Sequence, residues 1–224
     1  IPYPLWSRGL GDVYKRQQEY DRGKVLSKED LDEIEEFGRY LDVDGDGVPY
    51  RTYPGTHPQK GAYFTRGTSH DEYARYTEDG VKNAEILSRL TKKFQTASST
   101  VPAPIFNQEA STSSIGVIYF GSTDCSMQEA LDSLKDEKID VDAMRIRSFP
   151  FNLEVWEFIE EHDLLFIVEQ NRDGQMRTLL MAEGGIMPDK LVSILCFDGQ
   201  PITASFITNK INAHISGIPS VAAS

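Results

Sequence analysis

The stretch LLFIVEQNRDGQMRTLL, residues 164–180, decides the expected fold. Its first five residues, Leu164–Val168, are all apolar, which is typical of a strand covered on both faces of a sheet. A polar turn follows, and a helix is expected over about residues 174–183. A strand that leads directly into a helix is the repeating unit of an α/β protein.

The same alternation extends through residues 115 to 197. Further strands are expected at Ile115–Phe120, Ala143–Ser148 and Leu191–Phe197, and a further helix near Leu153–Glu161. Gly121-Ser122 leads into another helix, for which Ser126 and Glu129 have capping-box spacing. The expected fold class is therefore α/β, with a three-layer, mainly parallel sheet.

The preceding residues predict helical and irregular structure. Ser27 and Asp30 resemble a capping box, and an amphipathic helix is expected through Leu31, Ile34, Phe37 and Leu41. Six Pro and Gly residues make residues 48–67 an extended loop. A second helix is expected from about Asp79 to Phe94, with one apolar face: Val81, Ala84, Leu87, Leu90 and Phe94. Residues 95–114, rich in Ser, Thr, Ala and Pro, have the composition of a linker.

The overall composition excludes several classes of protein. A formal net charge of −12 disfavours binding to nucleic acid and to anionic membranes. No apolar run approaches the length of a membrane span. The two cysteines, Cys125 and Cys196, lie far apart, so neither a disulfide scaffold nor a zinc or iron–sulfur site built by this chain alone is expected. These properties favour a cytoplasmic protein.

Residues 7–17 are treated as foreign to the fold. The eleven residues SRGLGDVYKRQ resemble the translation of an adapter used in transposon-based sequencing libraries. Residues 1–17 are therefore interpreted as an artefact and left out of the fold prediction, with no core contacts expected from them.

An acidic turn raises the question of calcium. Asp42, Asp44, Asp46 and Gly47 match the opening of an EF-hand calcium loop. The twelfth position, which should supply a bidentate Glu, is Tyr53. A turn that ends a helix is the favoured interpretation, and a calcium-binding protein built on residues 42–47 remains an alternative.

The Gly/Pro-rich loop concentrates cations and hydroxyls: Arg51, His57, Thr65, Arg66 and His70. The planar guanidinium of an arginine matches a carboxylate, as a dicarboxylate substrate would require. The alternative is structural, with Arg51 paired to Asp71 or Glu72 to hold the loop. Residue chemistry alone favours the structural alternative.

Three longer stretches resemble one known family. They are DVDGDGVPYRTYPGTHPQKGAYFTRGTSHDEYARYTED (residues 42–79), GVIYFGSTDCSMQEAL (116–131) and FIVEQNRDGQMRTLL (166–180). All three resemble the α subunit of 2-oxoacid:ferredoxin oxidoreductases of the 2-oxoglutarate type. The likeness extends from about Gln18 to Ile211.

The resemblance implies a thiamine-dependent enzyme that decarboxylates a 2-oxoacid, transfers the acyl group to coenzyme A and passes electrons to ferredoxin. It assigns residues 18–94 to the tail of a pyrimidine-binding thiamine domain. Residues 115–211 become a domain like the transketolase C-terminal domain, followed by a tail at 212–224. Thiamine diphosphate, magnesium and an iron–sulfur cluster belong to the intact complex, in which the β subunit is the partner. This chain alone is expected to bind none of these cofactors and to be inactive.

The resemblance also selects candidate site residues. Arg51 and Thr65 are the expected contacts of the substrate carboxylate, and no catalytic or metal-binding residue is assigned to this chain. Asn171, Arg172 and Gln175 follow the C-terminal end of a strand, where α/β sheets place active sites or interfaces. The alternative for these three is a helix-capping turn at a subunit interface. The alternative for the α/β domain is a non-catalytic module that assembles subunits.

Overall fold

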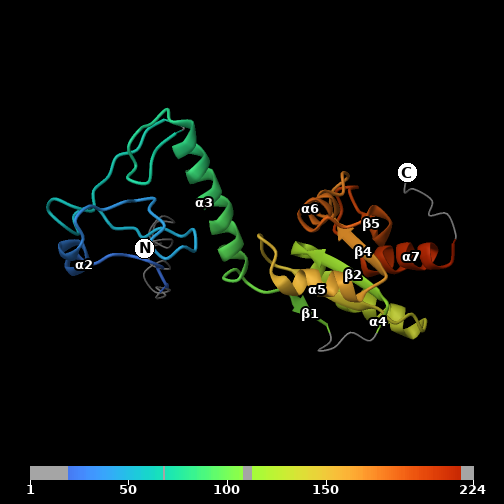
Figure 1. Cartoon of the computed structure of the whole chain (residues 1–224). Helices are drawn as coiled ribbons and strands as arrows, with labels where there is room; N and C mark the ends of the chain where they lie inside the picture. The colour runs from blue at the N-terminus through green and yellow to red at the C-terminus, as the bar shows by residue number, and fades with distance from the viewer. Residues whose placement is uncertain (1–19, 68, 108–112, 218–224) are drawn as a thin grey trace, which may run out of the picture. The chain divides into compact units, whose positions relative to one another are not determined.

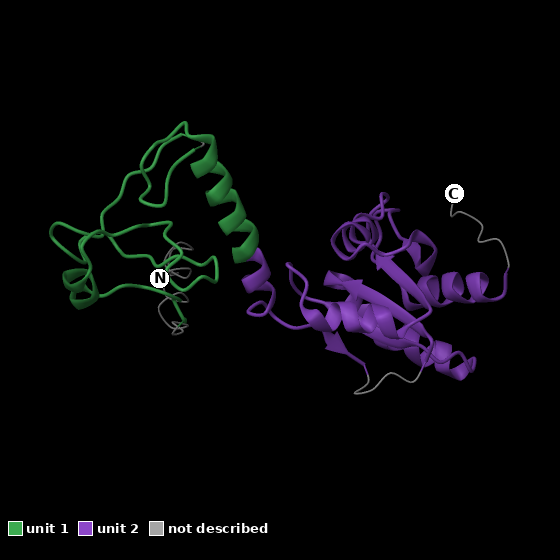
Figure 2. Cartoon of the chain, viewed as in Figure 1, with its two compact units in different colours: residues 1–93 green, residues 94–224 purple. Residues whose placement is uncertain are grey.

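The computed structural model describes residues 20–67, 69–107 and 113–217 of the chain. It divides into two compact units, unit 1 (residues 1–93) and unit 2 (residues 94–224), shown in Figure 2. Residues 1–17, interpreted above as an artefact, and most of the predicted tail at 212–224 lie outside the described residues.

Unit 2 is built on a five-stranded sheet in the order β1-β3-β2-β4-β5. Four strands are parallel: β2 (Ile115–Phe120), β3 (Asp142–Ile146), β4 (Leu164–Glu169) and β5 (Leu191–Leu195). The short edge strand β1 (Ile105–Phe106) pairs antiparallel with β3. The predicted mainly parallel α/β sheet is confirmed.

Helices cover both faces of this sheet (Figure 1). They are α4 (Asp124–Asp136), α5 (Leu153–Glu161), α6 (Gln175–Gly184) and α7 (Ala204–Ile215). On one face Phe166 and Val168 pack with apolar residues of α4 and α7. On the other, Leu165 and Ile167 pack with residues of α5 and α6. Successive residues of β4 thus enter opposite cores, and the prediction of a strand covered on both faces is confirmed.

Three details of unit 2 differ from the sequence prediction. Helix α4 begins at Asp124, so Ser126 is not its N-cap; the Ser126 hydroxyl donates to the carbonyl of Ile202 at 2.7 Å. Helix α7 was not predicted, and the expected domain end at residue 211 falls inside it. Residues 95–114, expected as a linker, include the end of helix α3 and the strand β1, which is too short to show an alternating pattern.

Unit 1 contains little regular structure. Helix α2 (Lys28–Glu33) begins with the predicted capping box: Ser27 Oγ accepts from the backbone N–H of Asp30 at 3.2 Å, and Asp30 accepts from that of Ser27 at 2.8 Å. The helix ends after six residues, so the longer amphipathic helix through Leu41 is wrong. The Lys60 ammonium donates to the carbonyls of Leu31 (3.0 Å) and Ile34 (2.5 Å), which satisfies the C-terminal end of α2.

Helix α3 (Gly80–Ser98) runs four residues beyond its predicted end. Its expected apolar face is not buried: Ile86 is its one buried residue, and Val81, Leu87 and Phe94 are each more than half exposed. The loop that precedes it has the extended, irregular backbone predicted for residues 48–67.

Gly47 brings the acidic turn against α3. Its φ is +79°, and a Cβ at this position would lie 2.4 Å from the backbone nitrogen of Lys93. Only glycine combines this backbone conformation with so close an approach. The guanidinium of Arg89 in α3 fixes the contact by donating to the carbonyl of Gly47 at 2.8 Å.

Candidate functional site

The acidic turn already holds a cation, the ammonium group of Lys24. Its Nζ lies 2.5 Å from a carboxylate oxygen of Asp44, 2.7 Å from one of Asp46 and 3.2 Å from the carbonyl of Val48. Hydrogen bonds to Asp44 and Asp46 hold the pKa of Lys24 above its usual range. The Lys24 side chain therefore supplies the positive charge that a calcium ion would bring.

The remaining oxygens of the turn serve the backbone. Asp42 accepts from the N–H of Gly47 at 3.0 Å, and Asp46 accepts from that of Val48 at 2.9 Å. These contacts are those of a tight turn. They support a turn over a calcium loop, but the prediction that this turn ends a helix is wrong, because α2 ends at Glu33.

Arg51 lies in the Gly/Pro-rich loop, where its backbone pairs with the chain near Val25. The N–H of Arg51 donates to the carbonyl of Lys24 at 2.9 Å, and its own carbonyl accepts from Leu26 at 2.8 Å. One guanidinium nitrogen donates to the carbonyl of Arg22 at 2.6 Å. The guanidinium lies 5.7 Å from the centre of the Tyr53 ring. The backbone of Arg51 is thus fixed by hydrogen bonds. Its side chain contacts no carboxylate among the described residues.

The predicted pairing of Arg51 with Asp71 or Glu72 is wrong. Asp71 accepts instead from the backbone N–H groups of Tyr73 (3.0 Å) and Arg75 (2.8 Å). Glu72 pairs with the ammonium of Lys82 at 3.1 Å. Both carboxylates that could have held Arg51 are therefore used elsewhere.

The two histidines of the loop have structural roles. His57 Nδ1 accepts from the backbone N–H groups of Gln59 (3.0 Å) and Lys60 (2.8 Å), while Nε2 faces Asp32 at 3.0 Å. His70 stacks on Tyr40 with ring centroids 4.1 Å apart. These contacts order the loop, and neither ring faces a free catalytic partner among the described residues.

Thr65 differs from the histidines because its hydroxyl has no partner. Thr65 Oγ1 is buried and makes no hydrogen bond within the described part of the chain. A buried hydroxyl without a partner is unusual in folded proteins. The neighbouring residues Phe64 and Arg66 line a cavity of about 660 Å³, which neither Arg51 nor Thr65 lines.

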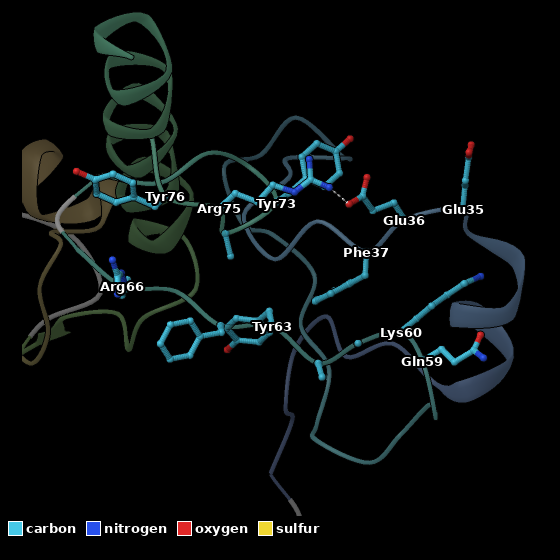
Figure 3. A pocket seen from close by; sticks show the side chains of 14 residues that line it. Glu35, Glu36, Phe37, Gln59, Lys60, Tyr63, Arg66, Tyr73, Arg75 and Tyr76 are labelled. Carbon is cyan, nitrogen blue, oxygen red and sulfur yellow. Dashed lines mark hydrogen bonds and ion pairs between the residues drawn. The ribbon is translucent and has the colours of Figure 1, made fainter. Parts of the chain in front are cut away.

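Aromatic and charged side chains both line this cavity (Figure 3). Its ring-bearing residues are Phe37, Tyr63, Phe64, Tyr73 and Tyr76. Among its charged residues, Lys60 is used by the carbonyls at the end of α2, and Arg75 pairs with Glu36, as the dashed line in Figure 3 shows. Arg66 makes no hydrogen bond or ion pair to another described residue. The cavity thus combines aromatic rings with charged side chains, and the guanidinium of Arg66 has no ion-pair partner among the described residues.

In unit 2 the candidate turn at Asn171 is built around a buried carboxylate. Glu169, fully buried at the end of β4, accepts from the backbone N–H groups of Met176 (2.7 Å) and Arg177 (3.0 Å) at the start of α6. Asn171 donates to Glu169 at 2.8 Å and accepts from the N–H of Asp173 at 3.1 Å. Both ends of the Asn171 amide are therefore used within the turn, as its helix-capping interpretation requires.

Arg172 and Gln175 differ from Asn171. The Arg172 side chain is 75% exposed and pairs with the adjacent Asp173 at 2.7 Å. Gln175 lines a crevice of about 440 Å³ together with Gly121, Ser122 and Gln170. This crevice lies at the C-terminal ends of β2 and β4, whose helices lead to strands on opposite sides, β3 and β5. Such a switch point is where open α/β sheets bind ligands.

Some residues of interest were not singled out by the sequence. The aromatic walls of the unit 1 cavity come from separate loop segments, so no spacing along the chain marks them. Arg39 and Arg89 have buried Nε atoms without hydrogen-bond partners among the described residues. Arg39 fell in a region expected to be helical, and Arg89 looked like an ordinary surface position of a helix. No sequence signal would have found either.

The described residues contain no cluster of three or more His, Cys, Asp or Glu side chains able to hold a metal ion. Both cysteines lie in unit 2, Cys125 exposed and Cys196 buried, and both are free thiols. Within the described part of the chain, no helix combines the length and apolarity that a membrane crossing requires.

Comparison with known proteins gives a consistent set of relatives. No family model matches the sequence. Subunit alpha of 2-oxoacid:ferredoxin oxidoreductase 2 from Aeropyrum pernix is 32% identical over 187 residues, which cover 81% of this chain and 27% of the relative. The 2-oxoacid:ferredoxin oxidoreductase subunit alpha of Saccharolobus solfataricus is 26% identical over 200 residues, covering 87% of this chain and 30% of the relative. The chain thus spans less than a third of the curated relatives it matches.

A solved structure shares the fold. It is the 2-oxoglutarate:ferredoxin oxidoreductase from Magnetococcus marinus with 2-oxoglutarate, coenzyme A and succinyl-CoA bound. It matches with a TM-score of 0.71 and 21% sequence identity, over 82% of this chain and 32% of that chain.

Proposed function

This chain is similar over most of its length to α subunits of 2-oxoacid:ferredoxin oxidoreductases, and we propose that it is part of such an α subunit. The observation that carries the proposal is the similarity to the Aeropyrum pernix subunit across both units, including the Gly/Pro-rich loop and the α/β unit. The reaction would convert a 2-oxoacid and coenzyme A to carbon dioxide and an acyl-CoA. The carbon–carbon bond beside the carboxylate breaks, a thioester forms, and the electron pair passes to ferredoxin.

The intact complex would supply the cofactors. Thiamine diphosphate would stabilise the carbanion left by decarboxylation, and an iron–sulfur cluster would carry the electrons. The described residues of this chain offer no three-ligand cluster for magnesium or for iron. In keeping with the family resemblance, we assign the cofactors to the β subunit and to other parts of the α subunit. This chain by itself is expected to be inactive.

Within the complex, Arg51 is the proposed contact of the substrate carboxylate. Its side chain makes one hydrogen bond, to the carbonyl of Arg22, and no ion pair with a described residue. A guanidinium held by a single carbonyl retains donors for a planar carboxylate. Thr65, whose buried hydroxyl lacks a partner among the described residues, is the second proposed contact.

The favoured substrate is 2-oxoglutarate, in keeping with the resemblance of the loop to the 2-oxoglutarate type. The experiment is to express the full-length α subunit that contains this sequence with its β subunit. Ferredoxin reduction is then followed with 2-oxoglutarate and with pyruvate, each with and without coenzyme A. The proposal predicts reduction that requires both a 2-oxoacid and coenzyme A, with a higher kcat/KM for 2-oxoglutarate. No 2-oxoacid-dependent reduction by a cofactor-loaded complex would refute it.

Arg51→Ala in that complex tests the substrate contact. Loss of a charge-assisted bond of roughly 1.5–3 kcal/mol should lower kcat/KM by about one to two orders of magnitude. Arg51→Lys should recover only part of this loss, since an ammonium lacks the planar fork. The control is Lys135→Ala, which removes one positive charge at an exposed position of α4 in unit 2. Unchanged kcat/KM in a folded Arg51→Ala complex would exclude the contact.

A further experiment tests the alternative for unit 2, that it only assembles subunits. If the crevice beside Gln175 takes part in the reaction, Gln175→Ala should change KM or kcat while the complex stays assembled. If unit 2 only assembles subunits, the same variant should leave both constants unchanged. Size-exclusion chromatography of the complex, run beside the kinetics, distinguishes the two.

A further inference from the structure

Unit 1 contains buried hydrogen-bond donors that no described residue satisfies. They are the Nε atoms of Arg39 and Arg89 and the hydroxyl of Thr65. Buried donors without acceptors are rare, because each loses its water without a replacement. Such donors indicate a bound group that carries hydrogen-bond acceptors.

Arg39 is the most exceptional of the three. Its guanidinium carbon lies 5.2 Å from the centre of the Tyr40 ring and 5.6 Å from that of Tyr63. It makes no hydrogen bond and no ion pair with any described residue. Two aromatic rings thus hold a half-buried guanidinium whose Nε has no acceptor among the described residues.

Arg89 adds a second guanidinium to the same place. Its guanidinium carbon lies 5.8 Å from the centre of the same Tyr40 ring, so both cations adjoin one aromatic side chain. Burial lowers the pKa of Arg89, the charge of Asp42 raises it, and the charge of Arg39, a smaller influence than that of Asp42, lowers it. Asp42 Oδ1 accepts from the backbone N–H of Gly47.

The surrounding contacts keep the two arginines in position. Tyr40 is fixed on its other side by the stacked ring of His70, at 4.1 Å between centroids. One terminal nitrogen of Arg89 is held by the carbonyl of Gly47 at 2.8 Å. Both positive groups are thus held in position by contacts with the protein.

We propose that Arg39 and Arg89 form a binding site for an oxyanion, the carboxylate or phosphate group of a small ligand. The oxyanion would accept from the Nε and a terminal N–H of Arg39, in the forked geometry that guanidinium groups offer. Its negative charge would be attracted by both guanidinium groups. The site is distinct from Arg51 and does not rest on the proposed enzyme function.

The purely structural explanation is that both guanidinium groups only stack on tyrosine rings. Stacking of arginine on aromatic rings is common and stabilising. It leaves the two buried Nε donors, however, without acceptors among the described residues. An oxyanion would supply an acceptor.

The test is calorimetric titration of the 224-residue chain with inorganic phosphate and, separately, with succinate. Ionic strength is held constant with sodium chloride, so that screening alone gives no saturable signal. We expect saturable binding of at least one of these anions, weakened about tenfold or more by Arg39→Met because the charge and the fork are both lost. Arg39→Lys should lie between the two.

The matched control is Arg22→Met. Arg22 also lies over a tyrosine, 5.6 Å from the centre of the Tyr20 ring, but it is exposed. This substitution changes the net charge equally and should leave the affinity unchanged. The phosphate and succinate arms distinguish a phosphate ligand from a carboxylate ligand.

Nitrogen NMR of the arginine side chains provides a second measurement on the unaltered chain. The Nε–H signals of Arg39 and Arg89 should shift on addition of the bound anion, and that of Arg22 should not. Absence of saturable binding for both anions would overturn the proposal. So would binding that Arg39→Met and Arg22→Met weaken equally, or binding that leaves the Arg39 signal unchanged.

Discussion

The two units of this chain are stabilised in different ways. In unit 2, two apolar clusters fill the space between the sheet and the helices on each of its faces. In unit 1, the buried hydrophobic side chains among the described residues are Leu31, Ala74 and Ile86. Aromatic residues of unit 1 such as Phe64, at 80% exposed, stay largely in contact with solvent.

Polar contacts between distant residues shape unit 1 in place of a large core. Lys24 binds a carboxylate of the acidic turn, and Lys60 donates to a carbonyl at the C-terminal end of α2. His57 orders the loop through its two ring nitrogens. Individual polar contacts of this kind contribute little net stability, whereas buried apolar area is the main stabilising term. The comparison teaches that the same type of substitution should have different effects in the two units.

Phe166→Ala should have the largest effect. Phe166 is fully buried in β4 and belongs to the cluster shared with α4 and α7. Its removal should cost about 3–5 kcal/mol in the free energy of unfolding, because transfer energy is lost and a cavity remains. Urea unfolding of the full chain, followed by far-ultraviolet circular dichroism, measures this.

Phe64→Ala in unit 1 is the matched control for the same change of side chain. Because Phe64 is 80% exposed, its removal should change the unfolding free energy by no more than about 0.5 kcal/mol. If the two variants lost equal stability, the contrast between the units would be wrong.

Glu169→Ala should have an intermediate effect. It leaves the backbone N–H groups of Met176 and Arg177, at the start of α6, without their acceptor. Unsatisfied buried donors cost about 1–3 kcal/mol each, and because these two bonds are only part-buried, a loss of roughly 2–4 kcal/mol is expected. Arg172→Ala, in the same turn but exposed, should stay within about 0.5 kcal/mol.

Hydrogen exchange distinguishes this prediction from a general loss of stability. Exchange of the amide protons of Met176 and Arg177 should accelerate in Glu169→Ala more than exchange in β2 or β3. Uniform acceleration across unit 2 would contradict the local role assigned to Glu169.

The sequence predicted unit 2 far better than unit 1, for a physical reason. The apolar run Leu164–Val168 reports burial on both faces directly, and β4 and α5 have the predicted bounds. In unit 1, Ile34, Phe37 and Leu41 have helical spacing, yet α2 ends at Glu33. Periodicity predicts a helix only where the apolar face is buried, and these residues have no such core to pack on.

The candidate site was only partly predictable. Arg51 and Thr65 stood out because the loop is rich in Gly and Pro and because of the family resemblance, and their roles stay predictions. The pairing of Arg51 with Asp71 or Glu72 was wrong because nearby backbone N–H groups and Lys82 take those carboxylates. Arg39 and Arg89 meet only through Tyr40, a contact between distant segments that spacing cannot reveal.

Lys24→Met should have the smallest effect on stability, and its signature is electrostatic. The hydrogen bond from Lys24 lowers the pKa of Asp46 below its ordinary value of 3.8, and the hydrogen bonds to Asp44 and Asp46 raise that of Lys24 above 10.5. The stabilisation by Asp46 is therefore fully present above pH 3.8 and is lost as the pH falls through its lowered pKa. The contribution of Lys24 is fully present below pH 10.5 and is lost as the pH rises through its raised pKa.

In Lys24→Met, a carboxyl-carbon NMR titration should show the pKa of Asp46 rising back toward 3.8, since its main cause is removed. Lys28→Met, which alters an exposed lysine of α2, should leave that pKa unchanged.

The unaltered chain should show no submicromolar calcium binding by calorimetry. The ammonium of Lys24 already neutralises Asp44 and Asp46, and Tyr53 cannot supply the bidentate carboxylate. Tight calcium binding by the unaltered chain, or an Asp46 pKa indifferent to Lys24, would show that the ion pair does not control this turn.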